Sequence, residues 1–312
     1  MSAWPEVAGP SPATEPALAA LIEQLRGSHR GAVRAVLLYG SCLRSGDLFD
    51  GLVDLYLVVD SYRGAYGRGW LALANRVLPP NVFYAQCELD GRILRSKVTV
   101  VSLDDFRHGC SRRWYQSYLW GRFSQPVRIV YARDADTTAA VTEAFREAAA
   151  TLLGRALPAL PASGSLGGLW EQALALSYGT ELRTERPGRA RELVSAALPF
   201  YETVTRLVAA GLPHGLELSG SGGRCRYRAS VAPGRRRLAP FAWGLRRVQG
   251  KALSVARLVK ALFTFTGGLD YIAWKLERHS GERIEVPPRV RRHPLLFSWG
   301  FFWRLYRRGI FR

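Results

Sequence analysis

The sequence has few of the residues from which metal clusters and disulfide frameworks are built. Only four cysteines occur in 312 residues, and no two of them form a CxxC pair. This argues against a structural zinc site and a disulfide-stabilised domain, and it favours reduced thiols. Residues 1–16 are rich in Pro and Ala and lack the basic flank and apolar core of a signal peptide. We expect them to be disordered.

Long hydrophobic runs are also missing. A membrane-spanning helix needs about 20 consecutive apolar residues. The best candidate, residues 294–303, is shorter and is followed at once by a cluster of arginines. The sequence therefore predicts a protein that can lie on a membrane but does not cross it.

Acidic residues are scarce in the last third of the chain. Residues 224–312 contain 21 Lys and Arg but only 4 Asp and Glu, which accounts for +17 of the formal net charge of +19. A basic segment of this kind binds polyanions, either nucleic acid or an anionic membrane surface. Forty of the 44 basic residues are Arg, which we attribute mainly to the base composition of a GC-rich genome.

One motif in the first half of the chain indicates a binding site for phosphate and a metal ion. An apolar strand ends in Tyr39-Gly40-Ser41, and a second apolar strand carries Asp54, thirteen residues after Ser41. Gly40 lets backbone N–H groups approach a phosphate closely, and Ser41 offers a hydroxyl donor. A carboxylate on a rigid strand can ligate a Mg²⁺ ion that bridges nucleotide phosphates. This layout is typical of a nucleotidyltransferase site.

Hydrophobic periodicity predicts an α/β or α+β domain over residues 17–135. Of the two fold classes we expect α+β, with a mixed sheet. The predicted strands are 33–39, 53–59, 81–86, 93–102 and 127–131, and the predicted helices are 16–26, 70–78 and 114–123. Asp90-Gly91 is a favoured hairpin turn, and residues 44–47 are predicted as a loop.

A helical middle domain is predicted over 136–238 and a basic amphipathic region over 239–312. The predicted elements are helices at 135–157, 169–180, 190–211, 241–265 and 269–278, a Gly/Ser-rich link at 163–168 and a Gly/Arg-rich loop at 212–238. Pro199 is expected to kink the helix that contains it.

Four segments, in order, resemble those of a known family. They are Tyr39-Gly40-Ser41 with Val53-Asp54-Leu55, the lysine-bearing strand 96–102, the segment 118–127, and the segment 176–183. The family is that of the mitochondrial-type CDP-diacylglycerol synthases, the translocator assembly and maintenance proteins, which has bacterial members. Beyond residue 205 the likeness is only a basic, aromatic C-terminal end.

The resemblance implies a Mg²⁺-dependent phosphatidate cytidylyltransferase, which makes CDP-diacylglycerol and pyrophosphate from CTP and phosphatidic acid. It implies a nucleotidyltransferase domain, a winged-helix-like middle domain and a C-terminal membrane-binding segment. Asp54 and Lys97 would then be catalytic, with Asp54 as a metal ligand. The resemblance leaves the second metal ligand unknown, and we expect it to be Asp50, which lies close to Asp54 in the sequence. The nucleotide-binding residues would be Tyr39, Gly40, Ser41, Arg122, Tyr178, Glu181 and Arg183.

Several assignments have a structural alternative. Arg122 can clamp a phosphate or hold a helix through a salt bridge, and Tyr178 and Glu181 can serve an interdomain contact instead of the nucleotide. The usual second carboxylate, two residues after Asp54, is replaced by Tyr56. Other candidates for the second metal ligand are Asp47, Asp50, Asp60 and Glu88.

The C-terminal end combines aromatic and basic side chains, which suits a membrane interface. The predicted membrane-binding residues are Trp299, Phe302, Trp303, Arg304, Arg307 and Arg308. We expect a bacterial cytoplasmic protein, peripheral on the inner face of the membrane. Two alternatives stay open: a nucleotidyltransferase acting on RNA or a small hydroxyl compound, and a non-catalytic binding module of the same fold.

Overall fold

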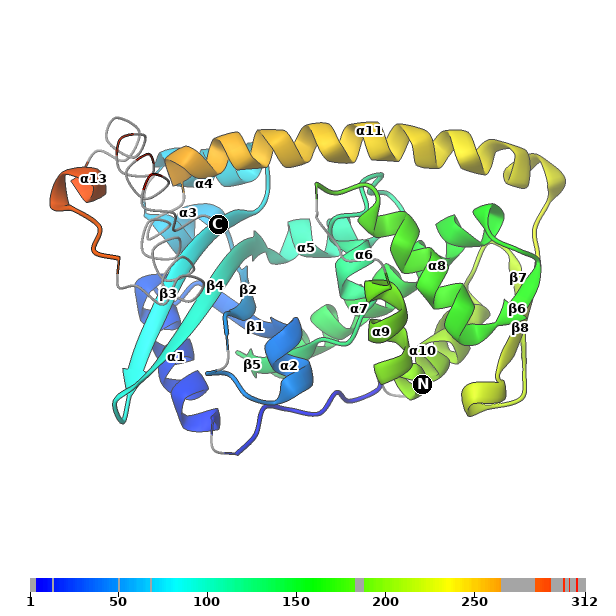
Figure 1. Cartoon of the computed structure of the whole chain (residues 1–312), viewed down its shortest axis with the longest axis horizontal. Coiled ribbons are helices and arrows are strands. Elements are labelled where there is room, and N and C mark those ends of the chain that lie inside the picture. The colour runs from blue at the N-terminus through cyan, green and yellow to red at the C-terminus, as the bar shows by residue number, and fades with distance from the viewer. Residues whose placement is uncertain are drawn as a thin grey trace.

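A five-stranded mixed sheet is the centre of the first half of the chain (Figure 1). The structure is a computed structural model that describes residues 4–12, 14–49, 51–67, 69–182, 188–264 and 284–292, with Gly300, Trp303 and Arg307. The strands are β1 (Val33–Tyr39), β2 (Val53–Val59), β3 (Asn81–Leu89), β4 (Arg92–Ser102) and β5 (Arg128–Ala132). Their order is β3-β4-β2-β1-β5.

Only one pair of neighbouring strands in this sheet, β2 and β4, is parallel. The hairpin from β3 to β4 turns at Asp90-Gly91, and both residues have positive φ, as a tight turn of this kind requires. This turn and the predicted strands are confirmed. The sheet is therefore mixed, as predicted, and the parallel pairing places the start of β2 beside the middle of β4, with Val53 opposite Ser96.

Each face of the sheet is buried. The helices of this half are α1 (Glu15–Ser28), α2 (Ser41–Ser45), α3 (Tyr62–Tyr66), α4 (Gly69–Val77), α5 (Leu103–Cys110), α6 (Trp120–Phe123) and α7 (Ala135–Ala156). Apolar residues of α1 and α3 pack on one face, and those of α5, α6 and α7 pack on the other. Alternating side chains of β2 thus reach two different cores, since successive residues of a strand point to opposite faces.

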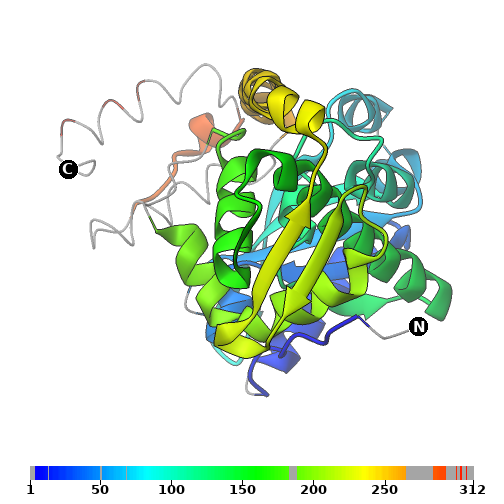
Figure 2. The same ribbon diagram turned by 90° about the vertical axis from the view of Figure 1, so that its right-hand side faces the viewer.

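A second, three-stranded antiparallel sheet lies in the second half (Figure 2). Its strands are β6 (Ser163–Ser165), β8 (Arg226–Ser230) and β7 (Gly215–Ser219), and the nearby helices are α8 (Leu166–Tyr178), α9 (Arg189–Ala196) and α10 (Leu198–Ala209). Short 3-10 turns occur at Leu157–Ala159 and Gly222–Arg224.

The predicted link over 163–168 and loop over 212–238 are therefore wrong. Residues 215–219 and 226–230 alternate exposed and less exposed side chains, with Leu216, Leu218, Tyr227 and Ala229 turned inward. That alternation is the signature of a half-buried hairpin, and the high glycine content of the region hid it.

Three smaller predictions also differ from the structure. Of the helix predicted over 114–123, only α6 forms. The predicted kinked helix over 190–211 is two helices, because Pro199 lies in the first turn of α10, directly after Leu198, where its missing N–H is not needed. Helix α2 ends at Ser45 and is capped by the left-handed Gly46, so the first two residues of the predicted loop at 44–47 are helical.

The longest helix, α11 (Pro233–Thr264), runs along one side of the molecule from the three-stranded sheet to β3 and α4 (Figure 1). At 1.5 Å per residue its 32 residues span about 48 Å. A short helix, α13 (Pro288–Arg292), follows. The predicted helix over 269–278 lies outside the described residues.

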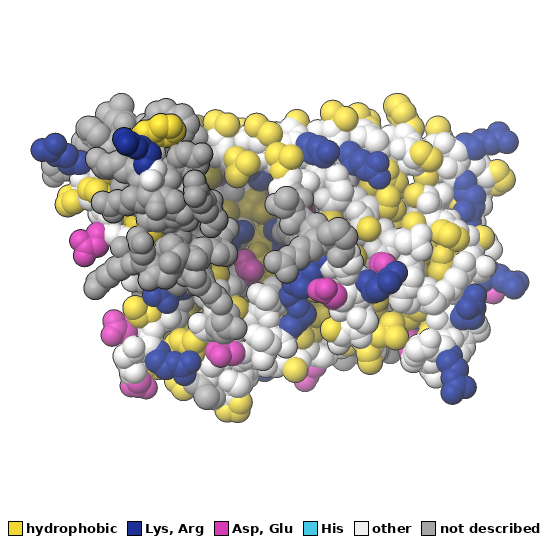
Figure 3. Space-filling model, in the orientation of Figure 1, with side chains coloured by type: hydrophobic (Ala, Val, Ile, Leu, Met, Phe, Trp, Pro, Cys, Tyr) yellow, Lys and Arg dark blue, Asp and Glu magenta, His cyan; other side chains and the backbone are white. Residues whose placement is uncertain are grey.

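One face of α11 is apolar and exposed. Its large exposed side chains recur at helical spacing and are Leu238, Phe241, Leu245, Val248, Val255, Leu258, Val259 and Phe263. Figure 3 shows hydrophobic side chains along the upper edge of the molecule, over this helix. No described helix is long and apolar enough to cross a membrane.

One hydrophobic core joins the two halves of the chain. It contains Leu37 and Tyr56 from the five-stranded sheet, Trp170 from α8, Tyr227 from β8 and Trp243 from α11. The predicted division at residues 135 and 238 stays a prediction.

Candidate functional site

Four side chains form a row across one face of the five-stranded sheet. Tyr84 is paired with Lys97, Lys97 with Asp54, and Asp54 with Tyr39. Neighbouring strands lie about 4.8 Å apart, and directly opposed residues share a face. The sheet therefore places the two predicted catalytic residues, Asp54 and Lys97, side by side at the start of the parallel pair.

The backbone of Gly40 lies against Asp54. Gly40 has φ 92° and ψ −156°, and a Cβ atom built on it would lie 2.7 Å from Asp54 Oδ2. Any other residue there would meet both backbone strain and the carboxylate. Arg44 donates a hydrogen bond of 2.9 Å to the Gly40 carbonyl oxygen. Ser41 is exposed and begins α2, so its hydroxyl is accessible beside this loop.

Tyr56, which stands where a second metal-binding acid is usual, belongs to the core. Its ring is fully buried and packs on Phe123 with centroids 4.9 Å apart. Its hydroxyl accepts a hydrogen bond of 2.8 Å from Arg122 Nη1. Burial raises the pKa of Tyr56, so it stays a neutral phenol. Tyr56 thus supplies packing and a hydrogen bond, and no negative charge.

Arg122 connects the sheet to the end of α8. Besides its bond to Tyr56, its Nη2 lies 3.4 Å from Glu181 Oε2, and both side chains of this ion pair are largely buried. Burial disfavours the charged form, but the surrounding tyrosines and Glu181 hold the pKa of Arg122 above its usual value. The predicted salt bridge is therefore present, and the phosphate clamp stays a prediction.

A cavity of about 420 Å³ opens beside this row. Four of its lining residues are basic and one is acidic: Lys97, Arg122, Arg257, Lys260 and Glu181. Its apolar wall is formed by Leu52, Pro80, Val82, Leu182, Leu258 and Ala261. The combination of positive charge and an apolar wall suits a ligand with an anionic group and a hydrocarbon part.

The last turns of α11 supply two of these cations. Lys260 Nζ donates to the carbonyl oxygens of Leu78 and Pro80, the latter at 2.7 Å, and burial lowers the pKa of Lys260 to about 7. Arg257 donates to the Pro79 carbonyl oxygen at 2.9 Å, but its buried Nη1 has no hydrogen-bond partner among the described residues. An anion in the cavity would satisfy that donor.

Tyr118 lies between two guanidinium groups. Arg122 Cζ is 4.5 Å from the centre of its ring and Arg257 Cζ is 4.3 Å from it. Burial alone would raise the pKa of Tyr118, but the positive charges of Arg122, Lys97 and Arg257 outweigh burial and lower it. Positive charge therefore dominates the inside of the cavity.

Tyr178 lies near the glycine loop rather than in the cavity. Its hydroxyl donates a hydrogen bond of 2.7 Å to Gln125 Oε1. Arg44 has a lowered pKa, mainly through burial, and both Tyr178 and Asp54 are close enough to oppose that shift. The end of α8 thus approaches the site from two sides, through Tyr178 and Glu181.

Some predicted site residues lie outside the described residues. These are Asp50, Arg183, Trp299, Phe302, Arg304 and Arg308. Trp303 and Arg307 are described and exposed. Within the described part of the chain, no three His, Cys, Asp or Glu side chains gather into a metal site.

The alternative metal ligands lie elsewhere. Asp60 is at the far end of β2, where Arg34 and Arg133 pair with it at 2.6 and 2.7 Å. Asp47 accepts a hydrogen bond from its own loop. Glu88 is exposed near the tip of the β3–β4 hairpin. Of these three acids, none is placed beside Asp54 in the sheet.

Sequence reasoning missed the contributions of Tyr118, Arg257 and Lys260. The segment 118–127 carries the family resemblance but indicates no role for Tyr118. The basic helix predicted over 241–265 indicates only membrane binding. One signal was available, because Lys260 is one of only four lysines in an Arg-dominated sequence.

No protein-family model matches the chain, and no curated protein matches it. Among solved structures, it is similar to a nucleotidyltransferase-like protein from Exiguobacterium sibiricum 255-15, with 14% identity and a TM-score of 0.26. The match covers 63% of this chain and 76% of the other. A likeness at this TM-score carries no argument, so the resemblance to the CDP-diacylglycerol synthase family remains a prediction from the sequence.

Proposed function

We propose that the chain is a Mg²⁺-dependent nucleotidyltransferase whose acceptor is an anionic amphiphile, and specifically that it converts CTP and phosphatidic acid into CDP-diacylglycerol and pyrophosphate. The observation that carries this proposal is the cavity beside the Asp54–Lys97 pair, which combines four cations with an apolar wall. A lipid phosphate has matching chemistry, an anionic head joined to hydrocarbon.

The nucleotide side of the site rests on Gly40 and Asp54. The positive-φ backbone of Gly40 turns the chain beside Asp54, and the exposed hydroxyl of the next residue, Ser41, would contact a triphosphate held there. Mg²⁺ is commonly held by one or two carboxylates together with substrate phosphates, so Asp54 fits as a ligand even without a second acid in the described residues. A bound Mg²⁺ ion would neutralise part of the negative charge of the phosphates.

The acceptor side rests on the cavity. A phosphate oxygen of the acceptor attacks the α-phosphorus of CTP, a new P–O bond forms, and the bond to the β-phosphate breaks to release pyrophosphate. Lys97 is placed to contact the reacting phosphates, since it lies beside Asp54 and also lines the cavity. Arg257 and Lys260 bind the anionic group of the acceptor. Arg122 positions the neighbouring side chains through its contacts with Tyr56 and Glu181.

The exposed apolar face of α11 supports a peripheral position on the inner face of a bacterial cytoplasmic membrane. The same helix lines the cavity with Leu258, Ala261 and its two cations. A helix with an apolar face and basic neighbours binds in the headgroup region of an anionic bilayer. A lipid acceptor would then reach the cavity without leaving the surface.

A second candidate, a non-catalytic binding module, is favoured by Tyr56. Its buried, neutral ring occupies the position of the usual second acid, which leaves Asp54 as the one described carboxylate in the row. Such a module would bind CTP or an anionic lipid without turnover.

Incubation of the purified full chain with radiolabelled CTP, Mg²⁺ and phosphatidate vesicles separates these functions. The proposal expects a labelled lipid product and equimolar pyrophosphate. Binding of CTP without any product supports the binding module, and label transferred to RNA but not to lipid supports the RNA alternative.

A further inference from the structure

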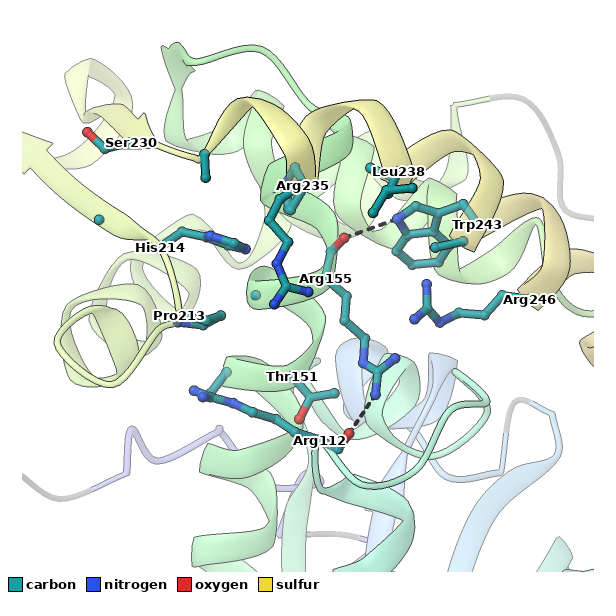
Figure 4. A pocket seen from close by; sticks show the side chains of 17 residues that line it. Arg112, Thr151, Arg155, Pro213, His214, Ser230, Arg235, Leu238, Trp243 and Arg246 are labelled. Atoms are coloured by element: carbon teal, nitrogen blue, oxygen red, sulfur yellow. Dashed lines mark hydrogen bonds between the residues drawn. The ribbon is translucent and has the colours of Figure 1, made fainter.

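A second cavity of about 610 Å³ lies at the other end of α11. It is enclosed by the first turns of α11, the end of α7 and the segment before β7, and Figure 4 shows it from close by. It shares no lining residue with the cavity at Lys97. Any ligand here is therefore held by a separate set of side chains.

The charged side chains that line this cavity are all basic. Arg112, Arg155, Arg235 and Arg246 line it together with His214, and its lining contains no Asp or Glu. Among the described residues, no carboxylate forms an ion pair with any of these four arginines. In Figure 4, Arg235 and His214 point into the cavity from α11 and from the segment before β7.

Two of the arginines are held in place by neutral groups. Arg155 donates to the carbonyl oxygens of Arg112 and Trp114 at 2.6 and 3.0 Å. Arg246, only 6% exposed, donates to the Tyr115 carbonyl oxygen at 3.0 Å. Trp243 in turn donates from Nε1 to the Arg155 carbonyl oxygen at 3.1 Å. These contacts and the neighbouring rings of Tyr115 and Trp243 position the two guanidinium groups, but among the described residues they supply no negative charge.

The arrangement is costly unless an anion binds. Burial and the charge of Arg246 lower the pKa of Arg155 to about 10, so two partly buried cations repel one another across the cavity wall. Buried charges in proteins are normally paired. Guanidinium groups match phosphate oxygens in shape and bind them with charge-assisted hydrogen bonds.

We propose that this cavity binds the phosphate group of a small phosphorylated ligand, at a site independent of the proposed transferase site. Arginines from α7, from α11 and from the segment after α5 would hold the phosphate, and Pro158, Pro213, Leu238 and Ala242 supply apolar walls for the rest of the ligand. Its volume is in the range usual for small-molecule sites, about 300–1,000 Å³. A soluble phosphate ester and a lipid headgroup share this chemistry, whereas an RNA strand needs a basic surface that extends beyond this one hollow.

Calorimetric titration of the full chain with inorganic pyrophosphate tests the site. The Lys97→Gln variant serves as the background, because pyrophosphate can also bind at the transferase site. On that background, replacing both Arg112 and Arg235 with Gln should weaken binding at least about tenfold, which corresponds to 1.4 kcal/mol. Arg237→Gln is the matched control, since Arg237 is on the same helix but does not line the cavity. It should leave binding unchanged.

The outcomes separate the sources of the phosphate. Pyrophosphate binding that depends on Arg112 and Arg235 supports a soluble ligand. Loss only of binding to phosphatidate-containing vesicles, measured by sedimentation, assigns the phosphate to a lipid headgroup. Binding that is unchanged in the double variant, equally reduced by Arg237→Gln, or lost only for RNA overturns the proposal. If the double variant fails to fold, Arg235→Gln alone, with its exposed side chain, gives the same comparison.

Discussion

Asp54 Oδ2 lies only 2.7 Å from the position that a Cβ atom on Gly40 would occupy. The glycine loop and the carboxylate strand, fourteen positions apart in the chain, are thus one unit. Under the proposed function, a nucleotide phosphate at the loop backbone would also lie beside the Asp54 carboxylate. This contact explains why the two halves of the motif belong together.

Gly40→Ala should raise the KM for CTP at least about tenfold, because the added Cβ displaces either the loop backbone or Asp54. Steady-state kinetics at saturating phosphatidate measures it. Gly91→Ala is the control. Gly91 also has positive φ, but a Cβ there meets nothing within 4 Å. That variant should lose some stability and keep its KM, and an equal rise in KM for both variants would contradict the role of the loop.

Arg122→Met should lower the free energy of unfolding by about 3–5 kcal/mol, since it removes the cation from a buried ion pair with Glu181 and the hydrogen-bond donor to Tyr56. Urea unfolding followed by circular dichroism measures this. Arg34→Met removes an ion pair with Asp60 that is more exposed, and it should cost about 1 kcal/mol or less. Similar losses in the two variants would show that the Arg122–Glu181 pair is not a buried support of the site.

Lys260 should make stability depend on pH. Its pKa is about 7 in the folded protein against an ordinary value of 10.5, so between these pH values the folded state holds fewer protons than the unfolded state. Stability should therefore rise as pH increases from about 7 to 10.5, and it should level off below pH 7, where both states hold the proton. Urea unfolding at several pH values should show a flatter profile for Lys260→Met. Parallel profiles would mean that the Lys260 ammonium is not desolvated.

Substitution of Phe241 and Val248 together by Ser should weaken sedimentation with anionic vesicles at least about tenfold, because both are exposed on α11 and each buried apolar side chain contributes about 1.5–3 kcal/mol. Neutral vesicles and high salt separate the apolar from the electrostatic part. Circular dichroism checks that the variant is folded. Unchanged sedimentation would remove α11 from the docking surface.

The first half of the fold follows from its sequence, because period-two strands and the Asp90-Gly91 turn are local signals. The three-stranded sheet was hidden, since glycines around Leu216 and Tyr227 masked a short alternation. In the site, the Gly40–Asp54 motif was visible in the sequence. The sequence does not indicate the hydrogen bond from Arg122 to Tyr56 or the position of Lys260 in the cavity. Both depend on contacts between residues far apart in the chain.

The most direct test of the account is the rate of CDP-lipid formation by Asp54→Asn, measured with labelled CTP, Mg²⁺ and phosphatidate vesicles. The substitution keeps the shape of the side chain and removes its charge. The account predicts a loss of at least about 100-fold, which is about 2.7 kcal/mol of barrier, with an unchanged unfolding curve. Asp47→Asn, in the exposed loop nearby, should keep its rate. Wild-type activity in Asp54→Asn, or no CDP-lipid from the wild-type protein, would contradict the account.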